Sequence, residues 1–161
     1  IVIVQHMPQG FTYEFAKSLD RICRLEVKEA VDGDIIKSGR VLIAPGNQHM
    51  IVEKKSLASV VRLLDTGHVN GQRTSVDVLF ESVSRNYKNH ALAVIMTGMG
   101  RDGARQIGSI FREGGYTIAQ DEKSSIVFGM PRVAIESGAI TKVVPLKEMA
   151  EAISETAKKY S

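Results

Sequence analysis

Short apolar runs alternate with amphipathic stretches along most of the chain. The run Ile1 to Val4 has no polar alternation, which predicts a strand buried on both faces. The following stretch, Pro8 to about Asp20, spaces Phe11, Phe15 and Leu19 four residues apart. This spacing predicts a helix that turns those three side chains inward. The chain therefore opens with a strand followed by a helix.

The pattern changes between Leu25 and Leu64. Here short apolar runs are separated by turn-forming pairs such as Asp32-Gly33 and Pro45-Gly46, which predicts strands joined by turns. A helix capped by Thr74 or Ser75 is predicted to follow and to end near Tyr87, with one apolar side formed by Val76, Leu79, Phe80 and Val83.

The remainder of the chain returns to a strand-helix rhythm. We expect strands at 91–96, 116–119 and 141–144, and helices at 102–113, from Pro131 to Gly138 and from Pro145 onward, the last with Leu146, Met149, Ala150 and Ile153 inward. This order predicts an α/β fold: a doubly wound, mostly parallel sheet with helices on both faces, interrupted by an antiparallel excursion between about residues 25 and 64. The length fits one domain comprising residues 1–161.

Composition narrows the class of protein. Hydrophobic residues make up 43% and charged residues 24% of the chain, which excludes disordered and coiled-coil classes. No apolar run reaches the roughly 18 residues of a membrane span, so we expect a soluble protein. The net charge of +3 and the lack of Trp argue against nucleic acid as a partner. Cys23 is the only cysteine; we expect it to be packed and the protein to be cytoplasmic.

Candidate chemistry lies in two loops that follow predicted strands. Gln5-His6-Met7-Pro8 follows the first strand, and a glycine-rich loop from Thr97 to Gly103 follows the strand at 91–96. Functional groups of parallel sheets gather at the carboxyl ends of strands, so we expect His6 and Asp102 to lie on one edge. A carboxylate at a helix N-terminus stays ionised and can hold a catalytic imidazole in one tautomer. Met99, between Gly98 and Gly100, is expected to cover this site.

Other interpretations of the same residues remain open. Gly98, Gly100 and Gly103, with Asp121 further along, match a dinucleotide-binding fingerprint. An oxidoreductase domain of the Rossmann type is therefore an alternative function, although Asp102 would compete with an anionic pyrophosphate. His6 and Asp102 also have plain structural interpretations, as a hydrogen-bonded histidine and a helix cap. His49, His68 and His90 lack partners at metal-ligand spacing, so we expect them to be surface or core residues and expect no metal site.

A histidine and an aspartate still need a nucleophile for acyl transfer. Ser124 and Ser125 lack the flanking glycines of a nucleophile elbow. We therefore expect the hydroxyl to come from a strand-turn-helix unit ahead of Ile1, a position that the given residues do not include.

Five sequence blocks, in order, together resemble a known family. They are Gln5-His6-Met7-Pro8; Ile43-Ala44-Pro45-Gly46 with His49-Met50; Ser75-Val76-Asp77-Val78-Leu79-Phe80; Met96-Thr97-Gly98-Met99-Gly100 with Asp102-Gly103; and Phe128-Gly129-Met130-Pro131. This set resembles the catalytic domain of the chemotaxis protein-glutamate methylesterases, the CheB type. The resemblance implies a doubly wound α/β domain that hydrolyses glutamate methyl esters on the cytoplasmic domains of chemoreceptors and deamidates certain glutamines.

The resemblance also implies roles for individual residues. In a Ser–His–Asp triad, His6 matches the general base and acid, Asp102 its orienting partner, and Met99 the methionine against the triad. The serine belongs to a glycine-rich loop before His6, and the regulatory receiver domain precedes the catalytic domain; neither is within residues 1–161, so we expect this chain alone to be nearly inactive. No cofactor is implied. Thr74 stands where the family usually has proline. A catalytically dead receptor-binding fragment is a further alternative.

Overall fold

In the computed structural model, which describes residues 1–160, the chain divides into two units. The first comprises Ile1–Ser82, and the second begins at Val83. Each unit has its own parallel sheet, and each is described by itself below. No helix among residues 1–160 is both long enough and apolar enough to cross a membrane.

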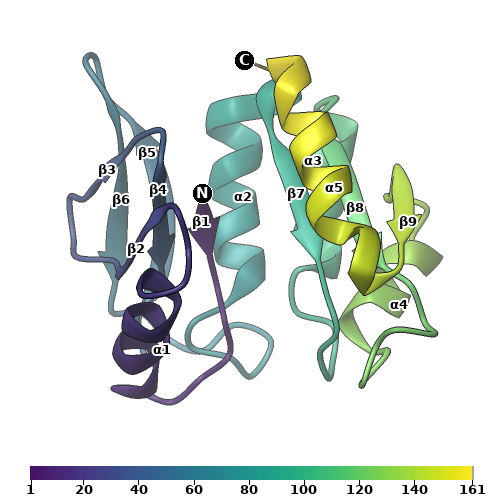
Figure 1. The fold of residues 1–161 in the computed structure, drawn as a ribbon, viewed down its shortest axis with the longest axis horizontal. Coiled ribbons are helices and arrows are strands. Elements are labelled where there is room, and N and C mark those ends of the chain that lie inside the picture. Colours follow the sequence, from purple (N-terminus) through teal and green to yellow (C-terminus); the bar gives the residue numbers. More distant parts are fainter. Residues whose placement is uncertain (161) are drawn as a thin grey trace. The chain divides into compact units, whose positions relative to one another are not determined.

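The first unit contains a parallel sheet of three strands. The strands β1 (Val2–Ile3), β4 (Arg40–Ile43) and β2 (Glu26–Glu29) lie in the order β1-β4-β2, with Val2 opposite Leu42 and Val27 opposite Val41. Helix α1 (Phe11–Asp20) packs on this sheet (Figure 1). The core between them consists of Ala16, Val27, Val41 and Ile43, with Ile3, Phe15 and Leu19 packed around it.

Two details of this region differ from the prediction. Helix α1 begins at Phe11, after a turn in which the Phe11 N–H donates to the Pro8 carbonyl (3.2 Å) and Gly10 adopts φ +87°. Its buried residues are Thr12 and Ala16, and Phe11 is exposed, because this start turns Phe11 away from the sheet. The first strand is half-buried rather than buried on both faces, since β1 lies at the edge of its sheet.

An antiparallel sheet completes the first unit. Its strands β3 (Ile35–Ile36), β6 (Ser59–Leu64) and β5 (His49–Lys54) lie in the order β3-β6-β5. The predicted antiparallel excursion is therefore present but narrower than residues 25–64, because β2 and β4 pair in parallel. Helix α2 (Val76–Tyr87) follows directly after Ser75, as predicted, and continues into a 3-10 turn, η1 (Lys88–His90).

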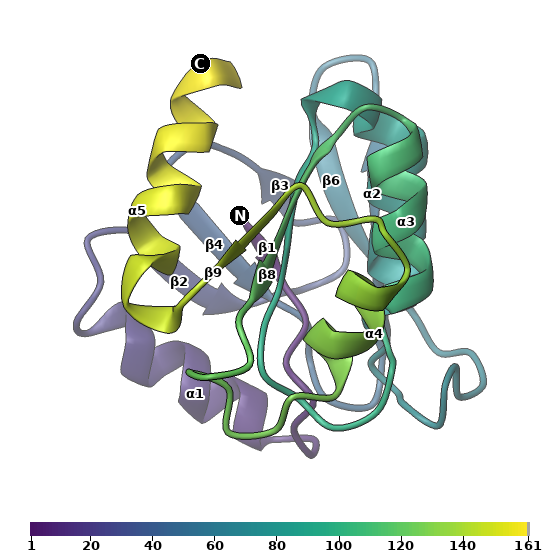
Figure 2. The same ribbon diagram turned by 90° about the vertical axis from the view of Figure 1, so that its right-hand side faces the viewer.

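The second unit is a parallel sheet covered on both faces. Its strands β7 (Leu92–Ile95), β8 (Tyr116–Gln120) and β9 (Lys142–Val144) lie in sequence order. Figure 2 shows α3 (Ala104–Arg112) and α4 (Met130–Glu136) on one side of β8 and α5 (Leu146–Ala157) on the other. The predicted α/β fold, with parallel strands, covering helices and an antiparallel segment, is confirmed.

The inward face of α5 differs from the predicted one. Met149, Ala152 and Thr156 are buried, and Ile153 packs against the core of Ile118 and Val144. Leu146 and Ala150, which were expected to point inward, are exposed. Residues 149, 152 and 156 are spaced three and four apart, so they lie on one face of the helix. Leu146 is the first residue of α5 and is exposed there. A final 3-10 turn, η2 (Lys158–Tyr160), follows.

Candidate functional site

The first candidate residue, His6, lies in the loop after the edge strand β1. The strand ends at Ile3, and His6 follows three residues later with its side chain half-buried. Strand β4 is parallel to β1, so its own following loop, which contains Gly46, lies at the same edge of the sheet. His6 thus occupies the carboxyl edge, where parallel sheets carry their functional groups.

Gly46 holds the segment that follows His6. A Cβ at this position would lie 2.7 Å from the Gln9 nitrogen, 2.7 Å from the Pro8 carbonyl carbon and 2.8 Å from the Met7 oxygen. All three atoms belong to the backbone, so no side-chain rotation could make room. The loops after β1 and β4 therefore approach each other more closely than any residue with a Cβ would allow.

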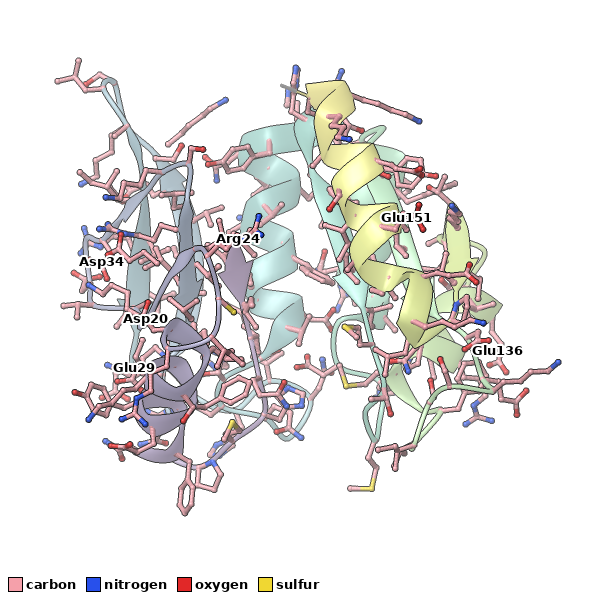
Figure 3. The ribbon with its side chains drawn as sticks, viewed as in Figure 1. Asp20, Arg24, Glu29, Asp34, Glu136 and Glu151 are labelled. Atoms are coloured by element: carbon pink, nitrogen blue, oxygen red, sulfur yellow. The ribbon has the colours of Figure 1, made fainter. Side chains whose placement is uncertain are left out.

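A buried threonine links the same loops to the rest of the sheet. Thr12, which is fully buried, accepts a hydrogen bond from the Gly46 N–H (3.0 Å) and donates one from its hydroxyl to the Glu29 carboxylate (2.5 Å). Glu29, labelled in Figure 3, is the last residue of β2. One hydroxyl therefore connects α1, the β4 loop and the carboxyl end of β2, so the support beneath the His6 loop is cross-linked by hydrogen bonds.

His6 opens onto a cavity of about 290 Å³. The cavity is lined by His6, Met7, Pro8, Gln72, Arg73 and Thr74. This volume lies at the bottom of the usual range of ligand pockets, about 300–1,000 Å³. A cavity of this size can hold one side chain of a substrate.

Residues 72–74, which also line the cavity, are attached to the loop after β4 by hydrogen bonds. The Thr74 hydroxyl donates to the Pro45 carbonyl (2.8 Å) and also contacts the Gln48 carbonyl, and the Asn47 N–H donates to the Arg73 carbonyl (3.1 Å). The guanidinium of Arg73 pairs with the Asp65 carboxylate. At the position where the resemblance leads one to expect proline, the threonine hydroxyl thus makes a hydrogen bond that proline could not donate.

The second candidate residue, Asp102, lies in the second unit. It follows β7, is only 2% exposed, and stands two residues before the first residue of α3. The intervening Gly103 is the N-cap and has φ +88°. Asp102 is therefore a buried acidic residue directly before the N-terminus of α3.

Glycines allow the loops after β7 and β8 to come into close backbone contact. The Gly98 N–H donates to the Val127 carbonyl (3.0 Å), and the Gly98 carbonyl accepts from the Met130 N–H (2.8 Å). A Cβ on Gly129 would lie 2.6 Å from the Gly98 oxygen. The loops after β7 and β8 are therefore paired through Gly98.

These contacts leave the dinucleotide hypothesis without support. The backbone groups of Gly98 are already paired within the protein, so its N–H is not available to a pyrophosphate. The Asp121 carboxylate, which would bind a ribose, accepts hydrogen bonds from the Ser124 N–H (3.0 Å) and hydroxyl (2.5 Å). Gly98 thus serves the packing of two loops, and Gly100 and Gly103 adopt the positive φ values of +89° and +88° that glycine tolerates.

Gln120 is a buried residue that the sequence interpretation missed. It ends β8 and is fully buried; its Oε1 accepts from the Thr97 N–H (2.9 Å), and its Nε2 donates to the Ser124 carbonyl (2.8 Å). The Ser124 hydroxyl oxygen in turn accepts from the Leu146 N–H (2.8 Å). The loops after β7, β8 and β9 are tied together at the carboxyl edge. The available signal was an amide residue at the end of an otherwise apolar strand.

Met99 is 82% exposed in the loop that carries Asp102. Three other apolar side chains of the β7 and β8 loops are exposed as well: Met96, Ile126 and Val127. Whether Met99 covers a catalytic site stays a prediction, as does the expectation that His6 and Asp102 serve one site, since the two residues belong to different units.

The remaining histidines and the cysteine have other surroundings. His49 is fully buried; its Nε2 bonds to the Gly67 carbonyl (2.8 Å) and its Nδ1 accepts from the Ser75 N–H (3.1 Å). Because the carbonyl can only accept, His49 carries its proton on Nε2. His68 and His90 are exposed, and no metal-binding cluster of His, Cys, Asp or Glu occurs among residues 1–160. Cys23 was expected to be packed, but its loop position after α1 leaves it exposed.

The shifted pKa values of the first unit belong to strand and turn contacts. Two hydrogen bonds from the Arg40 guanidinium (2.8 and 2.9 Å) lower the pKa of the Glu26 carboxyl. A hydrogen bond from the Leu63 N–H, supported by Arg62, lowers the pKa of Asp32. Burial raises the pKa of Asp34, but hydrogen bonds from the Val31 N–H and Lys28 outweigh it, so the pKa is lowered. These carboxylates stabilise the fold.

Comparison with known proteins gives a consistent result. The family model of the CheB methylesterase matches residues 1–153. A protein-glutamate methylesterase/protein-glutamine glutaminase of Treponema denticola is 59% identical over the whole chain, and one of Treponema pallidum is 55% identical. The chain spans 43% and 40% of the length of these two curated relatives.

A solved structure shares the fold. The crystal structure of the Thermotoga maritima CheB methylesterase catalytic domain superposes with a TM-score of 0.94 at 39% sequence identity, covering 97% of this chain and 82% of that one. Taken with the family match over residues 1–153, this similarity shows that the chain belongs to the CheB methylesterase family.

Proposed function

We propose that residues 1–161 form the catalytic domain of a protein-glutamate methylesterase. It hydrolyses methyl esters of glutamate side chains on the cytoplasmic domains of chemoreceptors, and it deamidates glutamines there. The observation that carries this proposal is the family match over residues 1–153, in a chain whose His6 and Asp102 each follow a parallel strand.

His6 and Asp102 take the two roles that ester hydrolysis requires of them. As a serine hydroxyl attacks the ester carbonyl carbon, the His6 imidazole takes the hydroxyl proton. The tetrahedral intermediate then collapses, the bond to the methoxy oxygen breaks, and His6 gives its proton to the departing methanol. A water molecule repeats the sequence on the acyl-enzyme and releases the glutamate. Asp102, fixed and buried, stabilises the imidazolium that forms.

The attacking hydroxyl comes from outside residues 1–161. The serines of the β8 loop are unsuited to the role: the Ser124 hydroxyl donates to Asp121 and its oxygen accepts from the Leu146 N–H, and the Ser125 hydroxyl donates to the Asp121 carbonyl. Relatives more than twice as long as this chain have room for the serine segment and for a receiver domain that regulates it. The protein works in the cytoplasm, where the modified receptor domains lie.

The direct test is methanol release by the natural-length protein from a methylated chemoreceptor fragment. Wild-type protein is expected to release methanol, whereas His6→Gln is expected to lose activity by about 10⁴-fold or more. A matched control is His90→Gln, since His90 is exposed in the second unit. No release by the wild type, or equal release by His6→Gln and His90→Gln, would contradict the proposed function.

A further inference from the structure

We propose that Arg73 forms a carboxylate-binding subsite beside His6, which recognises an acidic residue adjacent to the methyl ester on the substrate. The inference rests on the proposed function and adds a determinant of substrate choice. Its starting point is that Arg73 and His6 line the same cavity of about 290 Å³.

The guanidinium of Arg73 has hydrogen-bonding capacity left over. Its Nε–H is buried, and no acceptor for it occurs among residues 1–160. A buried charged donor without a partner is costly, and a carboxylate bound to the outer N–H groups of the same guanidinium would stabilise its charge. The Arg73 side chain is only 21% exposed, so a ligand anion would meet it in a partly desolvated setting, where charge-assisted hydrogen bonds are strong.

The ion pair that Arg73 does make shows which ligand it suits. Its Nη2 meets the carboxylate of Asp65, whose side chain is 75% exposed. An exposed partner of this kind is weakly held, because water and salt screen it. Asp65 therefore acts as a replaceable carboxylate: a substrate carboxylate can displace it or bind to the remaining N–H groups of the planar guanidinium, which is shaped for bidentate carboxylate binding.

The backbone of Arg73 is held by hydrogen bonds to the β4 loop, whereas its guanidinium is held by the ion pair with Asp65. The Arg73 carbonyl accepts the Asn47 N–H (3.1 Å), and the adjacent Thr74, which is 4% exposed, donates its hydroxyl to the Pro45 carbonyl (2.8 Å). Both contacts lead to the β4 loop, which also supports the His6 loop through Gly46. The backbone segments that carry Arg73 and His6 thus both contact the β4 loop, which gives the two residues a common support, as a specificity site requires.

The experiment uses two methylated receptor peptides and the natural-length protein. In one peptide the residues flanking the glutamyl methyl ester are glutamates; in the other they are alanines, which the deamidase activity cannot alter. We expect the wild type to show a KM about tenfold lower for the acidic peptide, as one charge-assisted hydrogen-bond pair would provide. In Arg73→Gln the ratio of the two KM values falls to about one, and Arg73→Lys restores part of it.

Two further variants make the test specific. Arg62→Gln removes another ion-paired arginine of the same unit, which bonds to Asp32, and is expected to keep the tenfold ratio. Asp65→Asn removes the competing carboxylate and is expected to lower the KM for the acidic peptide only. Since Asp65 is largely exposed, this variant tests the subsite even where Arg73 variants fold poorly.

The possible results distinguish a failure of the Arg73 subsite from a failure of the proposed methylesterase function. Hydrolysis of both peptides by the wild type with the same KM would overturn the subsite alone, and so would an equal ratio in wild type and Arg73→Gln. An Arg73→Gln effect seen only in inhibition by the demethylated product would assign the residue to the product carboxylate and overturn the flanking-residue assignment. Hydrolysis of neither peptide would overturn the proposed function together with the subsite.

Discussion

Replacing Gly46 with alanine tests whether the His6 loop is held by close backbone packing. The added Cβ would lie 2.7 Å from both the Gln9 nitrogen and the Pro8 carbonyl carbon, whereas ordinary contact begins at 3.4 Å. The two loops must therefore separate by about 0.7 Å. The Gly46 N–H also donates to Thr12 (3.0 Å), so the shift strains or breaks that hydrogen bond.

The cost follows from the size of this displacement. Overpacking of a well-packed region destabilises by about 1–3 kcal/mol. A displacement approaching 1 Å of a catalytic group reduces the rate by about 10²-fold. Gly46→Ala is therefore expected to lower the free energy of unfolding by about 1–3 kcal/mol and kcat for ester hydrolysis by about 10- to 100-fold.

Gly67→Ala is the matched control. Gly67 precedes α2 in the same unit, a Cβ there would meet no atom within 4 Å, and its φ is not in the left-handed region. Urea denaturation and methanol release, both on the natural-length protein, give the two readouts. If Gly46→Ala matched Gly67→Ala within twofold in kcat and within about 0.5 kcal/mol in stability, the argument from close loop contact would be refuted.

Three further predictions concern stability and loop geometry. Gln120→Met removes the acceptor of the Thr97 N–H and the donor to the Ser124 carbonyl; urea denaturation is expected to show a loss of about 1–3 kcal/mol, and a loss below 0.5 kcal/mol would contradict the role of Gln120. Asp34→Asn is expected to destabilise by about 1 kcal/mol at pH 7. Because the pKa of Asp34 is lowered from 3.8, the difference from wild type should persist above that pH and disappear as the pH falls through the folded-state pKa; a difference that grew towards low pH would contradict it. Gly129→Ala places a Cβ 2.6 Å from the Gly98 oxygen and is expected to reduce kcat more than Gly138→Ala does. Gly138 is the control, because its φ of +74° makes alanine unfavourable there without such a contact. A larger loss of kcat in Gly138→Ala would show that the contact between the two loops does not matter for activity.

Much of the fold could be predicted from apolar periodicity and turn residues. The strands at β7, β8 and β9 and the helices α2, α3 and α4 lie within a few residues of their expected positions, because each is a short apolar run or stripe between strong turn signals. The errors lie where periodicity is ambiguous. Phe11 fits a helical stripe with Phe15 and Leu19 but falls at the first residue of α1, after a turn that local spacing does not reveal.

Strand pairing was harder to predict than strand position. The runs that became β2 and β4 were expected in an antiparallel excursion, yet they pair in parallel, because partner choice depends on contacts between segments distant along the chain. In the candidate site, too, local sequence patterns indicated some residues, and only the tertiary structure indicated others. His6 and Asp102 were proposed from the sequence because they follow predicted strands. The burial of Gln120 and the cavity lined by Arg73 appear only in the structure, because no local pattern encodes them.

We propose that His6 and Asp102 act as one catalytic unit in methyl ester hydrolysis. The most direct test is kcat for methanol release by the natural-length protein with His6→Gln, Asp102→Asn and the double variant. Residues that act together show strongly non-additive losses. We predict a loss of about 10⁴-fold for Asp102→Asn, a loss at least as large for His6→Gln, and no further loss in the double variant. Single losses that multiply in the double variant would contradict the claim.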